Sequence, residues 1–116
     1  MDKLICEHTT LRRDAVITIY KRKIVLSARA CFILRLDGGP RCVRFSINDN
    51  KVCVSHADNH DKGFAVTFRK GRKTGQISST ELAGELAYLL GGYGIYKLSS
   101  KICFTEKGTR LFQIIK

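Results

Sequence analysis

Hydrophobic and polar positions along this chain follow one pattern twice. Over residues 15–55, a β-branched run, VITIY, is followed by a polar turn, a second apolar strand at 24–26, a short helical segment and two further alternating segments. Over residues 63–116 the same order begins again with FAVTF. β-branched and alternating segments favour strands. Each half is therefore expected to read strand, strand, helix, strand, strand.

The helical segment of each half has recognisable start signals. Ser27 suits an N-cap, because its hydroxyl can accept a hydrogen bond from a free backbone N–H, and the glycine-proline segment at 37–40 suits the end of that helix. In the second half, Ser78 and Glu81 have the spacing of a capping box. Leucines at helical spacing then predict an apolar stripe of Leu82, Leu86, Leu89 and Leu90.

The later strands of each half have a similar layout. The turn at 48–50 predicts a hairpin between 43–47 and 52–54. In the second half, a strand at 96–98 is expected to be extended by 102–104, and 111–115 closes the sheet. We expect a single domain over 1–116 of α+β class, predominantly β. The architecture would be a small barrel or wrapped antiparallel sheet built from two similar halves.

Composition supports a packed interior. Hydrophobic residues make up 44% of the chain, which argues against disorder. No apolar run approaches the ~20 residues of a membrane span, and the N-terminal segment carries acidic residues and lacks the apolar region of a signal peptide. We expect a soluble, cytoplasmic protein without a membrane partner.

The balance of charged residues indicates which kind of partner the protein binds. Lys and Arg number 21 against 10 Asp and Glu, a formal net charge of +11. An excess of this size on a small domain is typical of a polyanionic partner, because phosphate contacts release counterions. An acidic protein partner, or a purely solubilising role, would also account for it.

The positive charge is concentrated at the first turn of each half. Gly71 lets the backbone of the RKGRK turn approach a phosphate closely, and its cations can pair with phosphate oxygens. We expect the two basic hairpin tips to converge on one side of the molecule. Tyr20, Phe68 and Tyr96 are possible stacking faces for bases. The candidate nucleic-acid contacts are Lys21, Arg22, Lys23, Arg69, Lys70, Arg72, Lys73, Arg12 and Arg13.

Candidate chemistry is otherwise sparse. The five cysteines include no C-x-x-C pair, and Cys31, Cys42 and Cys53 read as buried free thiols in a reducing compartment. The segment with Cys53, His56 and His60 offers too few donors for a closed zinc site. No nucleophile elbow or phosphate loop occurs. We expect no metal, no cofactor and no catalytic residues, and hence a protein that is not an enzyme.

The stretch KIVLSARACFILRLDGGPRCVRFSINDNKVCVS resembles the AbrB-type (SpoVT/AbrB) swapped-hairpin domain. In that superfamily two such units interleave into one barrel, in some members within a single chain, and members commonly bind DNA through basic residues on one face. The resemblance implies that the DNA-binding residues here are Lys21, Arg22, Lys23, Arg69, Lys70, Arg72 and Lys73. The chain departs from the family pattern at both helix entries, where serine, alanine, threonine and charged residues replace the usual proline, and in the glycine turn at 37–39.

The sequence therefore predicts a nucleic-acid-binding protein, with DNA favoured over RNA. It would be a small regulator, for example of transcription, or an accessory factor that contacts phosphates through two basic turns. The main alternative is a non-enzymatic protein-interaction module, such as a phage or mobile-element inhibitor or assembly component, whose cationic face meets an acidic protein. A small-barrel enzyme with a cleft between its halves is a second alternative. The oligomeric state is left open.

Overall fold

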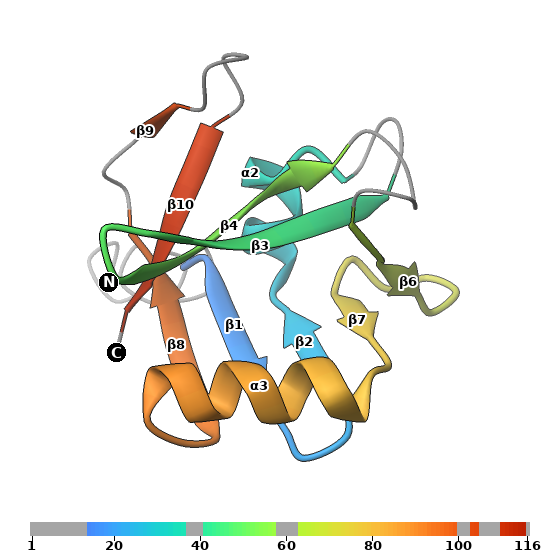
Figure 1. Ribbon diagram of the computed structural model, residues 1–116. Coiled ribbons are helices and arrows are strands. Elements are labelled where there is room, and N and C mark those ends of the chain that lie inside the picture. The colour runs from blue at the N-terminus through green and yellow to red at the C-terminus, as the bar shows by residue number, and fades with distance from the viewer. Residues whose placement is uncertain (1–13, 37–40, 58–62, 100–102, 105–109, 116) are drawn as a thin grey trace, which may run out of the picture.

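Over the residues that the structure describes, the fold is a mostly antiparallel β sheet that wraps into a nearly closed barrel with two helices (Figure 1). The computed structural model describes residues 14–36, 41–57, 63–99, 103–104 and 110–115. The predicted α+β class, predominantly β, is confirmed. The repeat of two halves stays a prediction.

In the described part of the chain, strands follow one another and are interrupted by two helices. The first part contains β1 (Val16–Ile19), β2 (Ile24–Leu26), α2 (Ala28–Ile33), β3 (Cys42–Asn48) and β4 (Lys51–Ala57). The second part contains β5 (Phe64–Ala65), β6 (Thr67–Phe68), β7 (Gly75–Ile77), α3 (Thr80–Leu90), β8 (Gly94–Leu98), β9 (Cys103–Phe104) and β10 (Arg110–Ile115). Neither helix has the length and apolar character that a membrane crossing requires, among the residues described.

One bent segment brings the two ends of the sheet together. The strand order is β5-β3-β4-β10-β8-β1-β2-β7-β6, with β9 beside β10. β5 and β6 are consecutive in the chain, yet β5 pairs with β3 and β6 pairs with β7. Between them, the Val66 N–H donates to the Arg41 carbonyl at 2.8 Å. The segment thus bridges the two edges and nearly closes the barrel.

The barrel interior is filled by alternate side chains of the strands. Ile17, Ile19, Ile24 and Leu26 are buried on β1 and β2, while the residues between them face outward. This is the period of two expected from a pleated strand. α3 lies across the lower end of the sheet in Figure 1 and contacts β1. Its buried residues are Leu82, Ala83, Leu86 and Ala87.

The start of α2 confirms the predicted cap. The Ser27 hydroxyl accepts from the Ala30 N–H at 3.2 Å and from the Val16 N–H at 2.9 Å, and it donates to the Asp14 carbonyl at 3.0 Å. Its one donor and two acceptor positions are therefore all used. The cap ties α2 to the start of β1. The helix ends at Ile33, earlier than the predicted glycine segment.

Replacing this cap should lower the stability of the protein. Ser27→Ala is expected to reduce the free energy of unfolding by about 1–2 kcal/mol, because it removes the cap and leaves the Val16 N–H without its acceptor. Thermal or urea unfolding measures the loss. Ser78→Ala is the matched control, since Ser78 is exposed and accepts one hydrogen bond, from the Gln76 side chain at 3.4 Å. Equal losses in the two variants would contradict this role of Ser27.

α3 begins one residue later than the capping box predicted. Ser79, not Ser78, is the N-cap, and its hydroxyl accepts from the Leu82 N–H at 3.2 Å. The predicted stripe is also wrong at Leu89, which is 41% exposed. Gly91 ends the helix in the left-handed region at φ 91°, a conformation that glycine adopts without a steric penalty.

Two strand connections test the remaining predictions. The hairpin between β3 and β4 is confirmed, and its two turn residues, Asp49 and Asn50, have φ of 51° and 64°, as a type I′ turn requires. The predicted extension of β8 by residues 102–104 is wrong. β9 is a separate strand that pairs with β10, Phe104 opposite Arg110.

Candidate nucleic-acid interface

Both basic segments form tight turns, as the sequence predicts. In the turn between β1 and β2, the Tyr20 N–H donates to the Lys23 carbonyl at 2.9 Å. In the turn between β6 and β7, the Arg72 N–H donates to the Arg69 carbonyl at 2.9 Å. Gly71, third in that turn, has φ of 76°, which is the position where a type II turn needs glycine.

The two tips do not converge, so this part of the prediction is wrong. β2 pairs antiparallel with β7, with Ile24 opposite Ile77 and Leu26 opposite Gly75. Each basic turn comes immediately before its strand of this pair. Because the two strands run in opposite directions, the turns lie at opposite ends of the pair.

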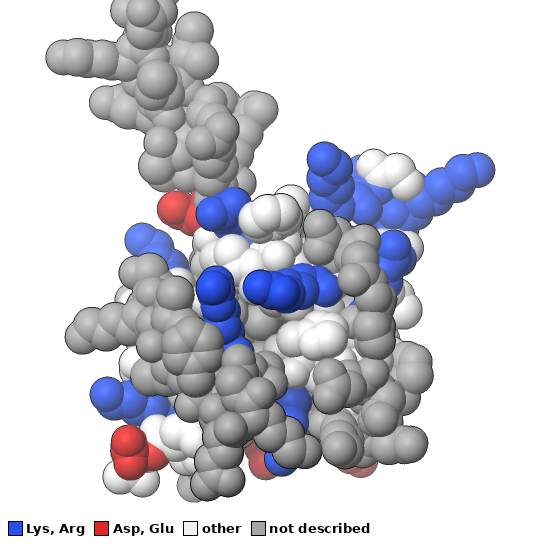
Figure 2. Space-filling model, turned by 90° about the horizontal axis from the view of Figure 1, so that it is seen from above, with Lys and Arg blue, Asp and Glu red and all other residues white. Residues whose placement is uncertain are grey.

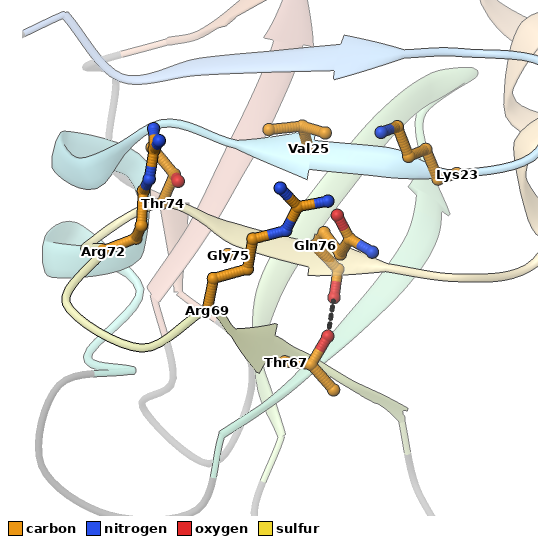
Figure 3. Close-up of a pocket in the computed structure, with 8 residues that line it drawn as sticks. All are labelled: Lys23, Val25, Thr67, Arg69, Arg72, Thr74, Gly75 and Gln76. Carbon is orange, nitrogen blue, oxygen red and sulfur yellow. Dashed lines mark hydrogen bonds between the residues drawn. The ribbon is translucent and has the colours of Figure 1, made fainter.

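Three of the predicted cations nevertheless line one pocket on the outer face of this strand pair. Lys23 comes from the first turn, and Arg69 and Arg72 come from the second. Figure 3 shows Lys23 at one end of the pocket, Arg72 at the other, and the Arg69 guanidinium between them, extended toward Gln76 and Val25. The pocket has a volume of about 160 Å³. Its lining is completed by Val25, Thr67, Thr74, Gly75 and Gln76.

The strand register explains why these residues share one face. Val25 lies opposite Gln76, and Gln76 lies opposite Thr67. The neighbours of Val25 in its strand, Ile24 and Leu26, are buried, so the cross-strand row itself points outward. The Thr67 hydroxyl donates to the Gln76 carbonyl at 3.2 Å, which fixes β6 against β7 (Figure 3).

The pocket is electrostatically suited to an anion. Its lining includes no Asp or Glu, and neither Arg69 nor Arg72 forms an ion pair with a carboxylate within the described ranges. A volume of 160 Å³ exceeds the ~15 Å³ that one water needs and falls below the ~300 Å³ of a typical small-molecule site. The pocket therefore suits one phosphate-sized group better than a whole small-molecule substrate.

The other predicted cations lie at the two turns or outside the described residues. Lys21 and Arg22 are exposed at the first turn, and Lys70 and Lys73 at the second. Figure 2 shows a group of Lys and Arg side chains projecting at the right of the view, the side on which β6 lies in Figure 1, with no acidic side chain among them. Residues 12 and 13, the predicted Arg12 and Arg13, lie outside the described residues.

The predicted stacking faces divide into three cases. Tyr96 is 1% exposed, and its hydroxyl donates to the Gly92 carbonyl at 2.6 Å, so it is a core residue and the prediction is wrong there. Phe68 is half-buried, with the Arg41 guanidinium 4.7 Å from its ring centre. Tyr20 is 49% exposed, and the Lys23 ammonium lies 5.4 Å from its ring centre. Of the three residues, Tyr20 alone is exposed.

Sequence reasoning missed the polar residues of the pocket and Arg41. Thr67, Thr74 and Gln76 enter the pocket through the pairing of β2 with β7 and β6. The sequence around these residues does not predict their place in the pocket, because the strand pairing joins segments that are far apart in the chain. Arg41 is an isolated cation whose contact with Phe68 depends on the bend between β5 and β6.

The three thiols predicted to be buried are buried. Cys31, Cys42 and Cys53 are buried. Burial raises the pKa of the Cys31 thiol, which therefore stays protonated at neutral pH and is a poor nucleophile. The described residues contain no group of three side chains able to hold a metal ion. His60, the third member of the segment considered in the sequence, lies outside them.

A comparison of the chain with protein-family models, curated proteins and solved structures finds no match. The resemblance to AbrB-type domains stays a prediction. The functional argument therefore depends on the chemistry of the pocket and the surface around it.

Proposed function

We propose that this protein binds nucleic acid through its phosphate groups, with Lys23, Arg69 and Arg72 as the central contacts. The observation that carries the proposal is the pocket that these three cations line, because its lining includes no carboxylate. Two guanidinium groups can each form paired hydrogen bonds with phosphate oxygens, and an ammonium adds a point charge. The exposed cations at both turns extend the same surface along a backbone.

The character of these contacts limits what the protein would recognise. Phosphate contacts fix the position of a protein on a nucleic acid but carry no sequence information. We propose DNA as the preferred ligand and a regulatory or accessory role, with no catalytic step. The exposed ring of Tyr20 beside Lys23 supplies one stacking surface for an unpaired base.

We also propose that the fold consists of two equivalent halves. Exchanging β2 with β7, β3 with β8 and β4 with β10 maps the β3–β4 pair onto the β8–β10 pair, and the β1–β2 pair then corresponds to the β6–β7 pair. The β2–β7 and β4–β10 pairs map onto themselves. The exchange is centred on Val25 and Gln76, in the lining of the pocket. Two halves related in this way would each contribute cations to one face although their tips point apart.

Binding should be detectable and strongly dependent on salt. We expect fluorescein-labelled single-stranded and duplex DNA to bind the protein in a polarisation assay, with affinity that falls between about 50 mM and about 200 mM salt. Neutralising about three duplex phosphates corresponds to a slope of log K against log salt near −3. A short duplex RNA provides the comparison for DNA preference.

The same titration can contradict the proposal. No saturable binding at the lower salt concentration, or a slope near zero, would show that the cations do not contact phosphates. Equal affinity for duplex DNA and duplex RNA would leave phosphate binding intact and remove the preference for DNA.

A further inference from the structure

One side of β3 has an open edge over most of its length. β3 pairs with β4 along the whole strand, from Cys42 opposite Ala57 to Asn48 opposite Lys51. On its other side, β5 pairs with Cys42 and Val43 alone. Among the residues that the structure describes, no strand pairs with 44–48 on that side. The bend between β5 and β6 nearly closes the barrel, but within the described ranges it leaves this edge without a paired strand.

The turn geometry identifies which backbone groups face the open side. In a two-residue hairpin loop, the flanking residues, here Asn48 and Lys51, form a hydrogen-bonded pair. Even-numbered residues of β3 therefore point their N–H and C=O toward β4. The Arg41 carbonyl accepts from Val66 on the opposite side, in agreement with this alternation. The N–H and C=O groups of Phe45 and Ile47 thus face the open edge.

The side chains along this edge favour a particular kind of strand. Ile47 is 58% exposed, and the half-buried Phe45 ring lies 6.3 Å from the Phe64 ring, centre to centre. These residues offer an apolar surface on one face of β3. Arg44 is exposed on the other face. An added strand would place its alternate side chains on these two faces, apolar beside Phe45 and Ile47, and acidic near Arg44.

We propose that the open edge of β3 binds an extended acidic peptide segment of a partner protein, by addition of a strand. Main-chain hydrogen bonds to Phe45 and Ile47 would supply affinity, and alternation of apolar and acidic residues would supply specificity. A second copy of this chain suits the edge less well, because each copy carries a net charge of +11. Exposed charge at an edge also protects against pairing of like chains. This surface is separate from the phosphate pocket and shares no residue with it.

The test uses a labelled peptide and a proline that blocks the edge. The probe is a fluorescein-labelled, end-capped heptapeptide of alternating Glu and Val, measured by polarisation at low salt against the full chain. Ile47→Pro removes the outward N–H and places its ring where the partner strand would lie, while the even-numbered residues keep their bonds to β4. Ile47→Thr is the matched control, since it keeps the N–H and strand preference. Melting curves of both variants check that the fold is retained.

We expect the Glu/Val peptide to bind saturably and a Lys/Val peptide of the same length not to bind. Ile47→Pro should weaken binding about tenfold or more, and Ile47→Thr less than about threefold. Absence of saturable binding by the Glu/Val peptide, or equal affinity of the proline variant and the original chain, would overturn the proposal. A concentration-dependent dimer that Ile47→Pro abolishes would overturn it too, in favour of a second copy as the occupant. None of these outcomes bears on DNA binding at the pocket.

Discussion

Reversing the charge of Lys23, Arg69 and Arg72 together is expected to weaken DNA binding about a hundredfold or more. Each substitution to Glu removes a phosphate contact and adds a repelling carboxylate. Charge-assisted hydrogen bonds contribute about 1.5–3 kcal/mol each, and each 1.4 kcal/mol corresponds to a tenfold change in affinity. The slope of log K against log salt should fall in magnitude by about one for each cation that no longer pairs with a phosphate.

A matched variant separates the position of these charges from their number. Arg44, Lys51 and Arg110 are exposed and do not line the pocket. Reversing either set of three lowers the net charge by two for each substitution, from +11 to +5. General electrostatic attraction then falls equally in both variants. We expect the control set to lose less than about fivefold in affinity. Equal losses in the two variants would show that the pocket has no special role.

Gly75→Ala is expected to lower the free energy of unfolding by about 2–3 kcal/mol, because this site has no room for a side chain. A Cβ at this position would lie 2.4 Å from the Val66 Cγ1 and 3.1 Å from the Cys31 Sγ. Gly75 is buried and pairs with both Leu26 and Phe68. Accommodating the methyl group requires β6 or β7 to shift. Urea denaturation of the variant and the original chain measures the loss.

A second substitution shows whether crowding is the cause. Val66→Ala removes the methyl group that the new Cβ would meet first. Gly75→Ala combined with Val66→Ala should therefore be less destabilised than the sum of the two single variants, with a coupling of about 1 kcal/mol or more. Additive losses would contradict the close contact. Gly84→Ala is a control in α3, since a Cβ there meets no atom within 4 Å.

Local pattern was sufficient for much of the fold. The β-branched run that begins at Val16 and the apolar segment at 24–26 predicted two strands, and the structure has β1 and β2 there. The two-residue turn of Asp49 and Asn50 predicted the β3–β4 hairpin. These features depend on neighbours within a few residues, through strand periodicity and turn stereochemistry.

Other features depend on contacts between distant segments. Whether Ser78 or Ser79 caps α3 depends on where β7 ends, and β7 is positioned by its pairing with β2. The basic turns were likewise predicted from the sequence, but their positions relative to each other were not. The antiparallel register of β2 and β7 separates the tips and gathers Lys23, Arg69 and Arg72 on one outer face.

The sequence by itself therefore determined the class of the fold, the positions of β1 and β2 in the chain and the two cationic turns. The tertiary structure alone decided which cations line one pocket, that Tyr96 belongs to the core, and that no described strand pairs with the outer side of β3 beyond Val43. The physical reason is that side-chain alternation is a property of each strand, whereas the choice and direction of its partners come from the packing of the whole barrel.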